Sequence, residues 1–194
     1  MGPIPLTETA RFDPEERRFL LDLARASIRH GLDQGRPLPV DPATAPPALR
    51  APAAAFVTLH RDGALRGCIG GLEPRRPLVA EVAANAYAAA FRDPRFPPLN
   101  PVEYPALEVE ISVLGPSEPL EFSDEADLLR QLRPGVDGLL LEENGRRGTF
   151  LPTVWESLPE PADFLAELKR KAGLPADYWS DRIRVSRYTT ETFG

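Results

Sequence analysis

The chain has 194 residues, of which 42% are hydrophobic, and this is enough to bury the core of one globular domain. Its formal net charge of -6 at pH 7 argues against a general nucleic-acid or anionic-membrane binder, because no excess of positive charge is present to neutralise phosphates. The first thirty residues lack an apolar signal core, and no run reaches the roughly 20 apolar residues of a membrane helix, so we expect a cytoplasmic protein.

The first predicted element is a helix over residues 14–30. Asp13 provides an N-cap acceptor, Pro14 fits the first helical position, and acidic residues follow in the first turn. Gly31 provides a stop signal. The next segment, residues 32–52, is rich in proline, which excludes a regular helix or an interior strand and predicts a stiff connection.

A β-hairpin is predicted around Asp62-Gly63, with strands over residues 54–60 and 64–72. Asp-Gly accepts the positive dihedral angles of a two-residue type I′ turn. In an unbroken register His60 lies opposite Leu65, and Val57 lies opposite Cys68.

This register places Cys68 and Arg66 on the same side as Val57 and Leu59, whereas His60 points to the other side. Cys68 and His60 then cannot pair. A β-bulge beside the glycines is the alternative, because it shifts the alternation by one residue.

A second helix is predicted from Pro77 to a stop at Pro94. A charged aromatic loop follows, and residues 107–113 then alternate apolar and polar side chains, which predicts a half-buried strand. Ser123 is the expected cap of a helix that runs to Leu132.

The last third of the chain predicts a second hairpin, a helix and a closing strand. The hairpin has strands at 138–142 and 147–151 around Asn144-Gly145, the helix covers 163–172, and the strand covers 182–190. Hairpins and helices alternate irregularly, which predicts an α+β fold with a mainly antiparallel sheet. We expect a single domain over residues 1–194, with a small second lobe.

The chemically distinctive stretch is Leu65-Arg66-Gly67-Cys68-Ile69-Gly70-Gly71, which holds the only cysteine. One cysteine cannot form an internal disulfide, so an intracellular location is expected. Three glycines around one thiol permit close approach of a backbone or a ligand. Residues 61–95 carry six arginines against four acids, which favours an anionic ligand.

Five segments resemble the AMMECR domain family, named after the Alport-syndrome, midface-hypoplasia and elliptocytosis chromosomal region. These segments are residues 65–70, 73–78, 89–96, 110–114 and 148–152. The resemblance implies a two-lobed α+β protein similar to the A component of the AmmeMemoRadiSam system, with a Memo-like protein and a radical SAM protein as partners. It implies a site at Arg66, Gly67, Cys68 and Gly70, and it assigns no reaction.

Thiol chemistry at this site requires a thiolate, which nearby positive charge or a helix N-terminus stabilises. Arg66 and the helix start at Pro77 are the candidates for this role, and Glu110 is the candidate general acid or base. We place Gly67, Gly70, Gly71, Arg92 and Arg95 in the ligand-binding set. The structural alternatives are a Cys68 buried as a small hydrophobe, a Glu110 on the wet face of a sheet, and a loop organised by Asp93 ion pairs.

No phosphate-binding loop, dinucleotide fingerprint, His-rich metal cluster or serine nucleophile elbow occurs in the sequence, so we expect no cofactor and no metal. The first hypothesis is a cleft around residues 66–71 that binds a small anionic ligand or a protein segment, with thiol-dependent chemistry. The second is a non-catalytic module that docks other proteins on the same glycine-rich surface. Nucleic-acid binding ranks last, because it depends on the local arginines alone.

Overall fold

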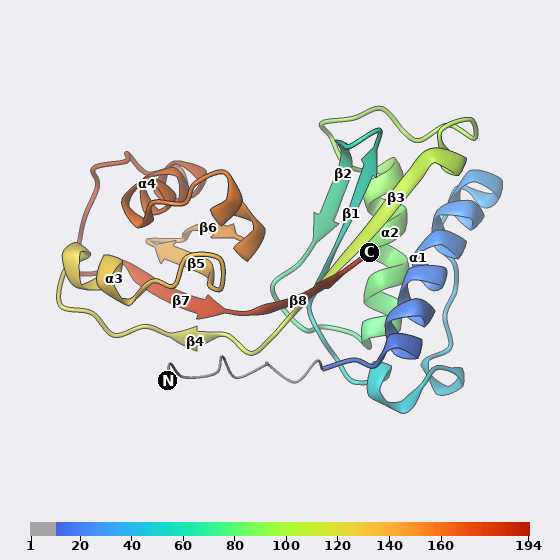
Figure 1. Cartoon of the computed structure of the whole chain (residues 1–194), viewed down its shortest axis with the longest axis horizontal. Coiled ribbons are helices and arrows are strands. Elements are labelled where there is room, and N and C mark those ends of the chain that lie inside the picture. The colour runs from blue at the N-terminus through green and yellow to red at the C-terminus, as the bar shows by residue number, and fades with distance from the viewer. Residues whose placement is uncertain (1–10) are drawn as a thin grey trace, which may run out of the picture. The chain divides into compact units, whose positions relative to one another are not determined.

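The computed structural model describes residues 11–194, and Figure 1 shows the arrangement of the helices and strands within each part. The chain forms two compact units. The first unit ends at Leu114 and also contains the C-terminal segment Glu191–Gly194, and the second unit covers Gly115–Thr190. Both contain helices and an antiparallel sheet, which confirms the α+β class with unequal lobes. Residues 1–10 of the expected domain lie outside the described residues.

Helix α1 (Pro14–Gln34) begins as the sequence predicts, with a capping box. The Asp13 carboxylate accepts from the backbone of Glu15 and Glu16, and the Glu16 carboxylate accepts from the backbone of Asp13. The stop predicted at Gly31 is wrong, because the helix ends four residues later at Gly35, whose φ is 67°.

Gly31 has a packing role instead. A Cβ atom there would lie 2.5 Å from the ring of Phe91, so the missing side chain makes room for a neighbouring helix. That helix is α2 (Leu78–Phe91), which lies beside α1 on one face of the first sheet (Figure 1). It ends three residues before Pro94, because proline disfavours helical geometry in the residue that precedes it.

The connection between α1 and the first strand contains two short 3₁₀ turns, η1 (Pro42–Thr44) and η2 (Pro47–Leu49). Leu49 is fully buried and anchors this proline-rich segment in the first core.

The first hairpin consists of β1 (Ala55–Arg61) and β2 (Ala64–Gly70). Asp62 and Gly63 have φ values of 53° and 75°, as the two-residue turn requires. His60 lies opposite Leu65, as expected. A bulge follows, and the predicted pairing of Val57 with Cys68 is therefore wrong.

Beyond the bulge, Cys68 lies opposite Thr58, and Gly67 lies opposite Leu59. Arg66 is the extra residue at this break in the register. The bulge moves Cys68 to the side of the sheet that carries Thr58 and His60.

The first sheet has the strand order β2-β1-β3-β8, where β3 is Leu107–Leu114 and β8 is Thr190–Phe193. A short 3₁₀ turn, η3 (Tyr104–Ala106), leads into β3. One face packs on α1 and α2 through Ala55, Val57 and Leu59. The opposite face, which carries Phe56, Thr58 and His60 of β1, is called the helix-free face below, because no helix within residues 11–114 covers it.

The second unit has the strand order β4-β7-β5-β6. Its strands are β4 (Glu118–Pro119), β5 (Gly138–Glu143), β6 (Arg146–Phe150) and β7 (Arg184–Tyr188). Its helices are α3 (Glu125–Gln131), η4 (Pro152–Glu156) and α4 (Pro161–Lys171). Positive φ values at Asn144 and Gly145 confirm the turn of the second predicted hairpin.

Two predictions for this part of the chain need correction. Helix α3 is capped by Asp124 and not by Ser123, because the Asp124 carboxylate accepts from the backbone of Asp127. The single closing strand predicted over 182–190 is two strands that belong to different sheets, β7 and β8.

The core of the second unit is built around an aromatic stack. Trp155 and Phe164 lie with ring centroids 3.7 Å apart, and the indole N–H of Trp155 donates to the carbonyl of Asp137. Trp155 is therefore part of the packed core.

Candidate functional site

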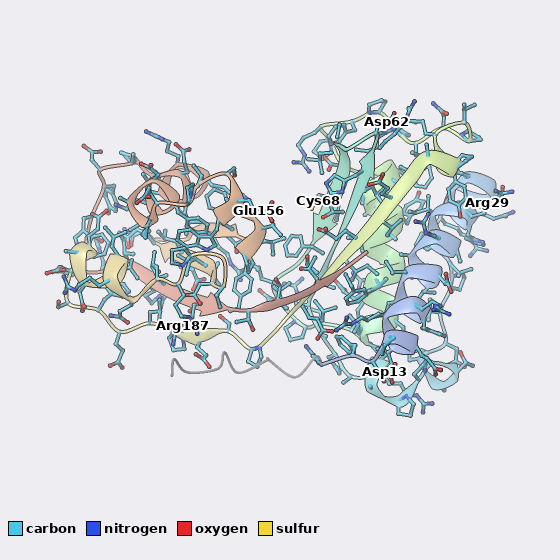
Figure 2. The ribbon with its side chains drawn as sticks, viewed as in Figure 1. Asp13, Arg29, Asp62, Cys68, Glu156 and Arg187 are labelled. Carbon is cyan, nitrogen blue, oxygen red and sulfur yellow. The ribbon has the colours of Figure 1, made fainter. Side chains whose placement is uncertain are left out.

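Cys68 lies on β2, the edge strand of the first sheet, and Figure 2 shows it on the hairpin whose turn holds Asp62. Its side chain is half-buried on the helix-free face. The hydroxyl of Thr58 donates to Sγ over 3.3 Å. A hydroxyl hydrogen bond of this kind stabilises a sulfur that carries negative charge.

The outward backbone groups of Cys68 are occupied by the loop that follows α2. The Cys68 N–H donates to Asp93 Oδ2 over 2.9 Å, and Arg95 Nη2 reaches the Cys68 carbonyl at 3.4 Å. Because these groups point away from β1, Thr58 and Cys68 form a non-hydrogen-bonded pair, in which facing side chains approach most closely.

Asp93 is the organiser of this loop. It is 4% exposed, and its carboxylate accepts from the backbone N–H, Nε and Nη2 of Arg95. The hydrogen bonds from Arg95 hold the pKa of Asp93 well below its usual range against the effect of burial, and the Cys68 N–H adds to this. Asp93 therefore carries a negative charge that holds the Arg95 side chain beside Cys68 of β2.

Arg66 points into a buried ion pair. Its Nε and Nη2 bind the two carboxylate oxygens of Glu103 over 2.7 and 3.0 Å, and Nη2 also donates to the carbonyl of Pro97. The Arg66 hydrogen bond lowers the pKa of Glu103 to about 2, despite burial. The positive charge that the sequence places beside the thiol is thus paired, although Arg66 Nη1 is buried without a hydrogen-bond partner among residues 11–194.

Arg95 supplies a positive charge that interacts with Cys68. Its pKa is raised mainly by the Asp93 hydrogen bond, against burial, and the charges of Asp93 and Cys68 raise it further. Its side chain is 54% exposed and lies over Phe96, the ring that Arg66 also approaches. Arg92 does not join this group, because its guanidinium lies over the ring of Tyr87.

The glycines serve packing more than access. A Cβ atom on Gly67 would lie 2.1 Å from the Ala89 carbonyl of α2, and one on Gly70 would lie 2.3 Å from the Phe56 ring. The close approach expected from the sequence is thus made by the chain itself at these two positions. Gly71 differs, because the nearest atom to its added Cβ would be a carboxylate oxygen of Glu81 at 3.9 Å.

Glu110 lies on β3 directly opposite Thr58, which itself lies opposite Cys68. The three residues form a row across the helix-free face, and two strand spacings place the backbones of Cys68 and Glu110 about 10 Å apart. The structure therefore brings the carboxylate to the same face as the thiol without direct contact. Ser112, on the same side of β3, bonds Thr192 of β8.

Two side chains of this face were not assigned to the site from the sequence. Thr58 contacts the sulfur directly, and His60 lies two residues along β1 on the same face. The signal for both is the alternative register with a bulge, which puts the even-numbered residues of β1 on the side of Cys68. No three His, Cys, Asp or Glu side chains between residues 11 and 194 are grouped to hold a metal ion.

No helix within residues 11–194 is long and apolar enough to cross a membrane.

The AMMECR1 family model matches residues 21–193. A protein of Methanothermobacter thermautotrophicus is 40% identical over 185 residues, covering 92% of this chain and 94% of that protein. A protein of Thermococcus gammatolerans is 41% identical over 194 residues, covering 94% and 92%.

A solved structure shares the fold. The crystal structure of an uncharacterized protein from Pyrococcus horikoshii has a TM-score of 0.87 and 38% sequence identity, and the match covers 94% of this chain and 92% of that one.

Proposed function

This chain belongs to the AMMECR1 family, and we propose that the helix-free face of its first sheet binds a small anionic ligand beside Cys68, whose thiolate acts as a nucleophile. The observation that carries the proposal is the 3.3 Å hydrogen bond from Thr58 to the sulfur. The unpaired cysteine fits a reducing compartment, so we place this function in the cytoplasm.

Thr58 and Arg95 support a reactive sulfur. Thr58 donates a hydrogen bond to the sulfur, and the Arg95 guanidinium lies close enough to interact with a negative charge on Cys68. Because Arg95 is fixed by Asp93, its charge stays near the thiol strand in the absence of ligand. Preorganised donors of this kind stabilise a developing negative charge without further rearrangement.

Arg95 supports an anionic ligand, because its guanidinium is half-exposed and reaches the Cys68 carbonyl. Arg66 is held in its buried ion pair with Glu103 and supports the strand from behind. Glu110 lies at the far end of the row, with its backbone about 10 Å from that of Cys68, and we assign it to proton transfer on the ligand.

The test is the rate at which iodoacetamide alkylates Cys68 in the folded protein. We expect Thr58→Val and Arg95→Gln each to slow alkylation about fivefold, because each removes a group that stabilises negative sulfur. Arg92→Gln is the matched control and leaves the rate unchanged. Inorganic phosphate is expected to protect the thiol in the wild-type protein. A thiol that alkylates only in urea would contradict the proposal.

A second candidate function is docking of a protein partner without catalysis. Leu65 and Val102 are 41% and 87% exposed, and they flank the Arg66–Glu103 pair that joins their segments. The candidate contact surface consists of these two exposed apolar side chains and the ion pair between them. The resemblance to the AmmeMemoRadiSam system makes the Memo-like and radical SAM proteins the proposed partners.

Pull-down of these two proteins separates the candidates. Docking alone predicts capture that survives Cys68→Ser and is lost on Val102→Asp. Capture that depends on Cys68 and not on Val102 would contradict docking at this surface.

A further inference from the structure

The second unit contains a pocket of about 700 Å³, a volume within the range of small-molecule sites. It opens where the chain after β4 leaves β7. Leu120 still bonds the carbonyl of Val185, whereas Phe122 and Ser123 line the pocket together with residues 179–181.

One wall of the pocket is aromatic. Phe122 and Trp179 pack with ring centroids 5.8 Å apart, and both line the cavity. Trp179 is supported by the fully buried Lys169, whose Nζ lies 5.5 Å from the ring and binds Glu125. This support fixes the indole in place, so the wall is formed before any ligand arrives.

The charged residues of the lining are mostly acidic. They comprise three acids, Glu121, Glu142 and Asp181, and one base, Arg184. Arg184 lies opposite Glu142 in the register of β5 and β7, and Glu142 forms an ion pair with Arg147 over 4.0 Å. Glu121 and Asp181 are exposed and form no ion pair within residues 11–194. The net charge of the lining is therefore negative.

A further carboxylate lies behind the wall. Glu143 is 2% exposed, and its Oε1 accepts from the hydroxyls of Tyr178 and Ser180, the second of which lines the pocket. Its Oε2 is buried and has no hydrogen-bond partner among the described residues. Arg182 Nε lies 4.0 Å from Oε1, so this carboxylate has its own counter-charge, and its role here is to hold Tyr178 and Ser180 in place.

From this arrangement we propose that the pocket binds a small alkylammonium ligand of the polyamine type. Phe122 and Trp179 cover the methylene chain, and Glu121 and Asp181 bind the ammonium groups. An anion is disfavoured by the charge of the lining. This site differs from the proposed Cys68 site in unit, charge and ligand, so either can fail without the other.

Spermidine is the probe, titrated against the full-length protein at low ionic strength. Trp179 lines the pocket and Trp155 is 3% exposed in the core, so a saturable change of tryptophan fluorescence reports the pocket. Calorimetry repeats the titration, so that a silent tryptophan does not hide binding. Trp179→Phe is expected to remove the fluorescence change.

We expect Glu121→Gln and Asp181→Asn each to weaken spermidine binding about fivefold, and the double variant more than tenfold. Asp177→Asn, an exposed carboxylate of the same unit outside the pocket, is the matched control and changes binding less than about twofold. Sodium citrate is expected not to bind. The proposal fails if spermidine shows no saturable binding up to about 10 mM. It also fails if Asp177→Asn weakens binding as much as the pocket variants.

Discussion

The two units use buried charge in different ways. In the second unit, Lys169 is fully buried and binds Glu125 together with the carbonyl of Ala176, and the buried Asp137 binds Arg133. The first pair joins α4 to α3, and the second closes the turn before β5. In the first unit, Asp93 and the Arg66–Glu103 pair instead hold a loop along the edge of β2.

This difference separates charges that lie within a core from charges that fix a loop beside the strand of Cys68. A neutral loop could close the edge of β2, yet the chain places Asp93, Arg95 and the Arg66–Glu103 pair along this strand. The predictions below test whether the first unit depends on these charges as strongly as their burial indicates.

The largest effect is expected from Glu103→Gln, which leaves the buried Arg66 guanidinium without a counter-charge. We expect the free energy of unfolding of the first unit to fall by about 4 kcal/mol. Glu108→Gln is the matched control, because Glu108 is an exposed residue of β3, and it changes stability by less than about 0.5 kcal/mol. Urea unfolding followed by circular dichroism measures both. A loss below about 1 kcal/mol for Glu103→Gln would show that the pair is dispensable.

Gly67→Ala is expected to cost about 3 kcal/mol, because the new Cβ meets the backbone carbonyl of Ala89, which cannot rotate away. Gly148→Ala in the second unit meets the Ala172 nitrogen at 2.9 Å and is expected to cost about 1–2 kcal/mol. Gly71→Ala is the control and leaves stability within about 0.5 kcal/mol. The same urea titrations rank the three, and equal losses at Gly67 and Gly71 would refute the packing role.

The units are expected to respond to opposite extremes of pH. The pKa of Glu103 is lowered to about 2, so its contribution is present above about pH 4.5 and is lost as the pH falls. Burial raises the pKa of Tyr188 in the second unit to about 12, so its contribution is present below pH 10 and is lost as the pH rises.

Both tryptophans lie in the second unit, so their fluorescence follows that unit alone. We expect it to decline above pH 10, with about 2–3 kcal/mol lost by pH 12, while Tyr188→Phe removes most of this loss. In acid, the far-UV circular dichroism, to which α1 and α2 contribute most of the helical residues, is expected to change before the fluorescence. The reverse order in acid would contradict this assignment.

The smallest effects are expected at the helix caps. Asp13→Ala removes the capping box of α1 and is expected to cost about 1 kcal/mol, and Asp124→Ala in α3 about the same. The matched control is Asp22→Ala, within α1, which is expected to change stability by less than about 0.5 kcal/mol. Thermal unfolding distinguishes them, and a larger loss at Asp22 than at Asp13 would contradict the capping role.

Local signals in the sequence predicted most elements. Asp13-Pro14, Asp62-Gly63 and Asn144-Gly145 carry their own geometry, so the helix start and both hairpin turns are confirmed. The helix stop predicted at Gly31 was wrong, because a glycine at a contact between two helices looks the same in sequence as a glycine at a helix end. The break between β7 and β8 could not be predicted from the sequence either, because it depends on which of the two sheets each strand joins.

The sequence places the candidate site on one strand but does not determine which side chains surround it. The glycine-rich segment marks the strand that carries Cys68. The bulge at Arg66 decides which side chains accompany the thiol, and a bulge leaves no certain signal in one sequence. The partner of Arg66, Glu103, is 37 residues away, and such long-range pairing cannot be deduced from spacing.

The strand order of the first sheet has a consequence for synthesis of the chain. Strand β8 borders β3, yet it is translated after all the residues of the second unit. While the ribosome makes residues 115–190, the outer edge of β3 has no neighbouring strand from its own sheet. A nascent chain with such an edge is open to mispairing with other chains, so rapid folding of the second unit shortens the period of risk.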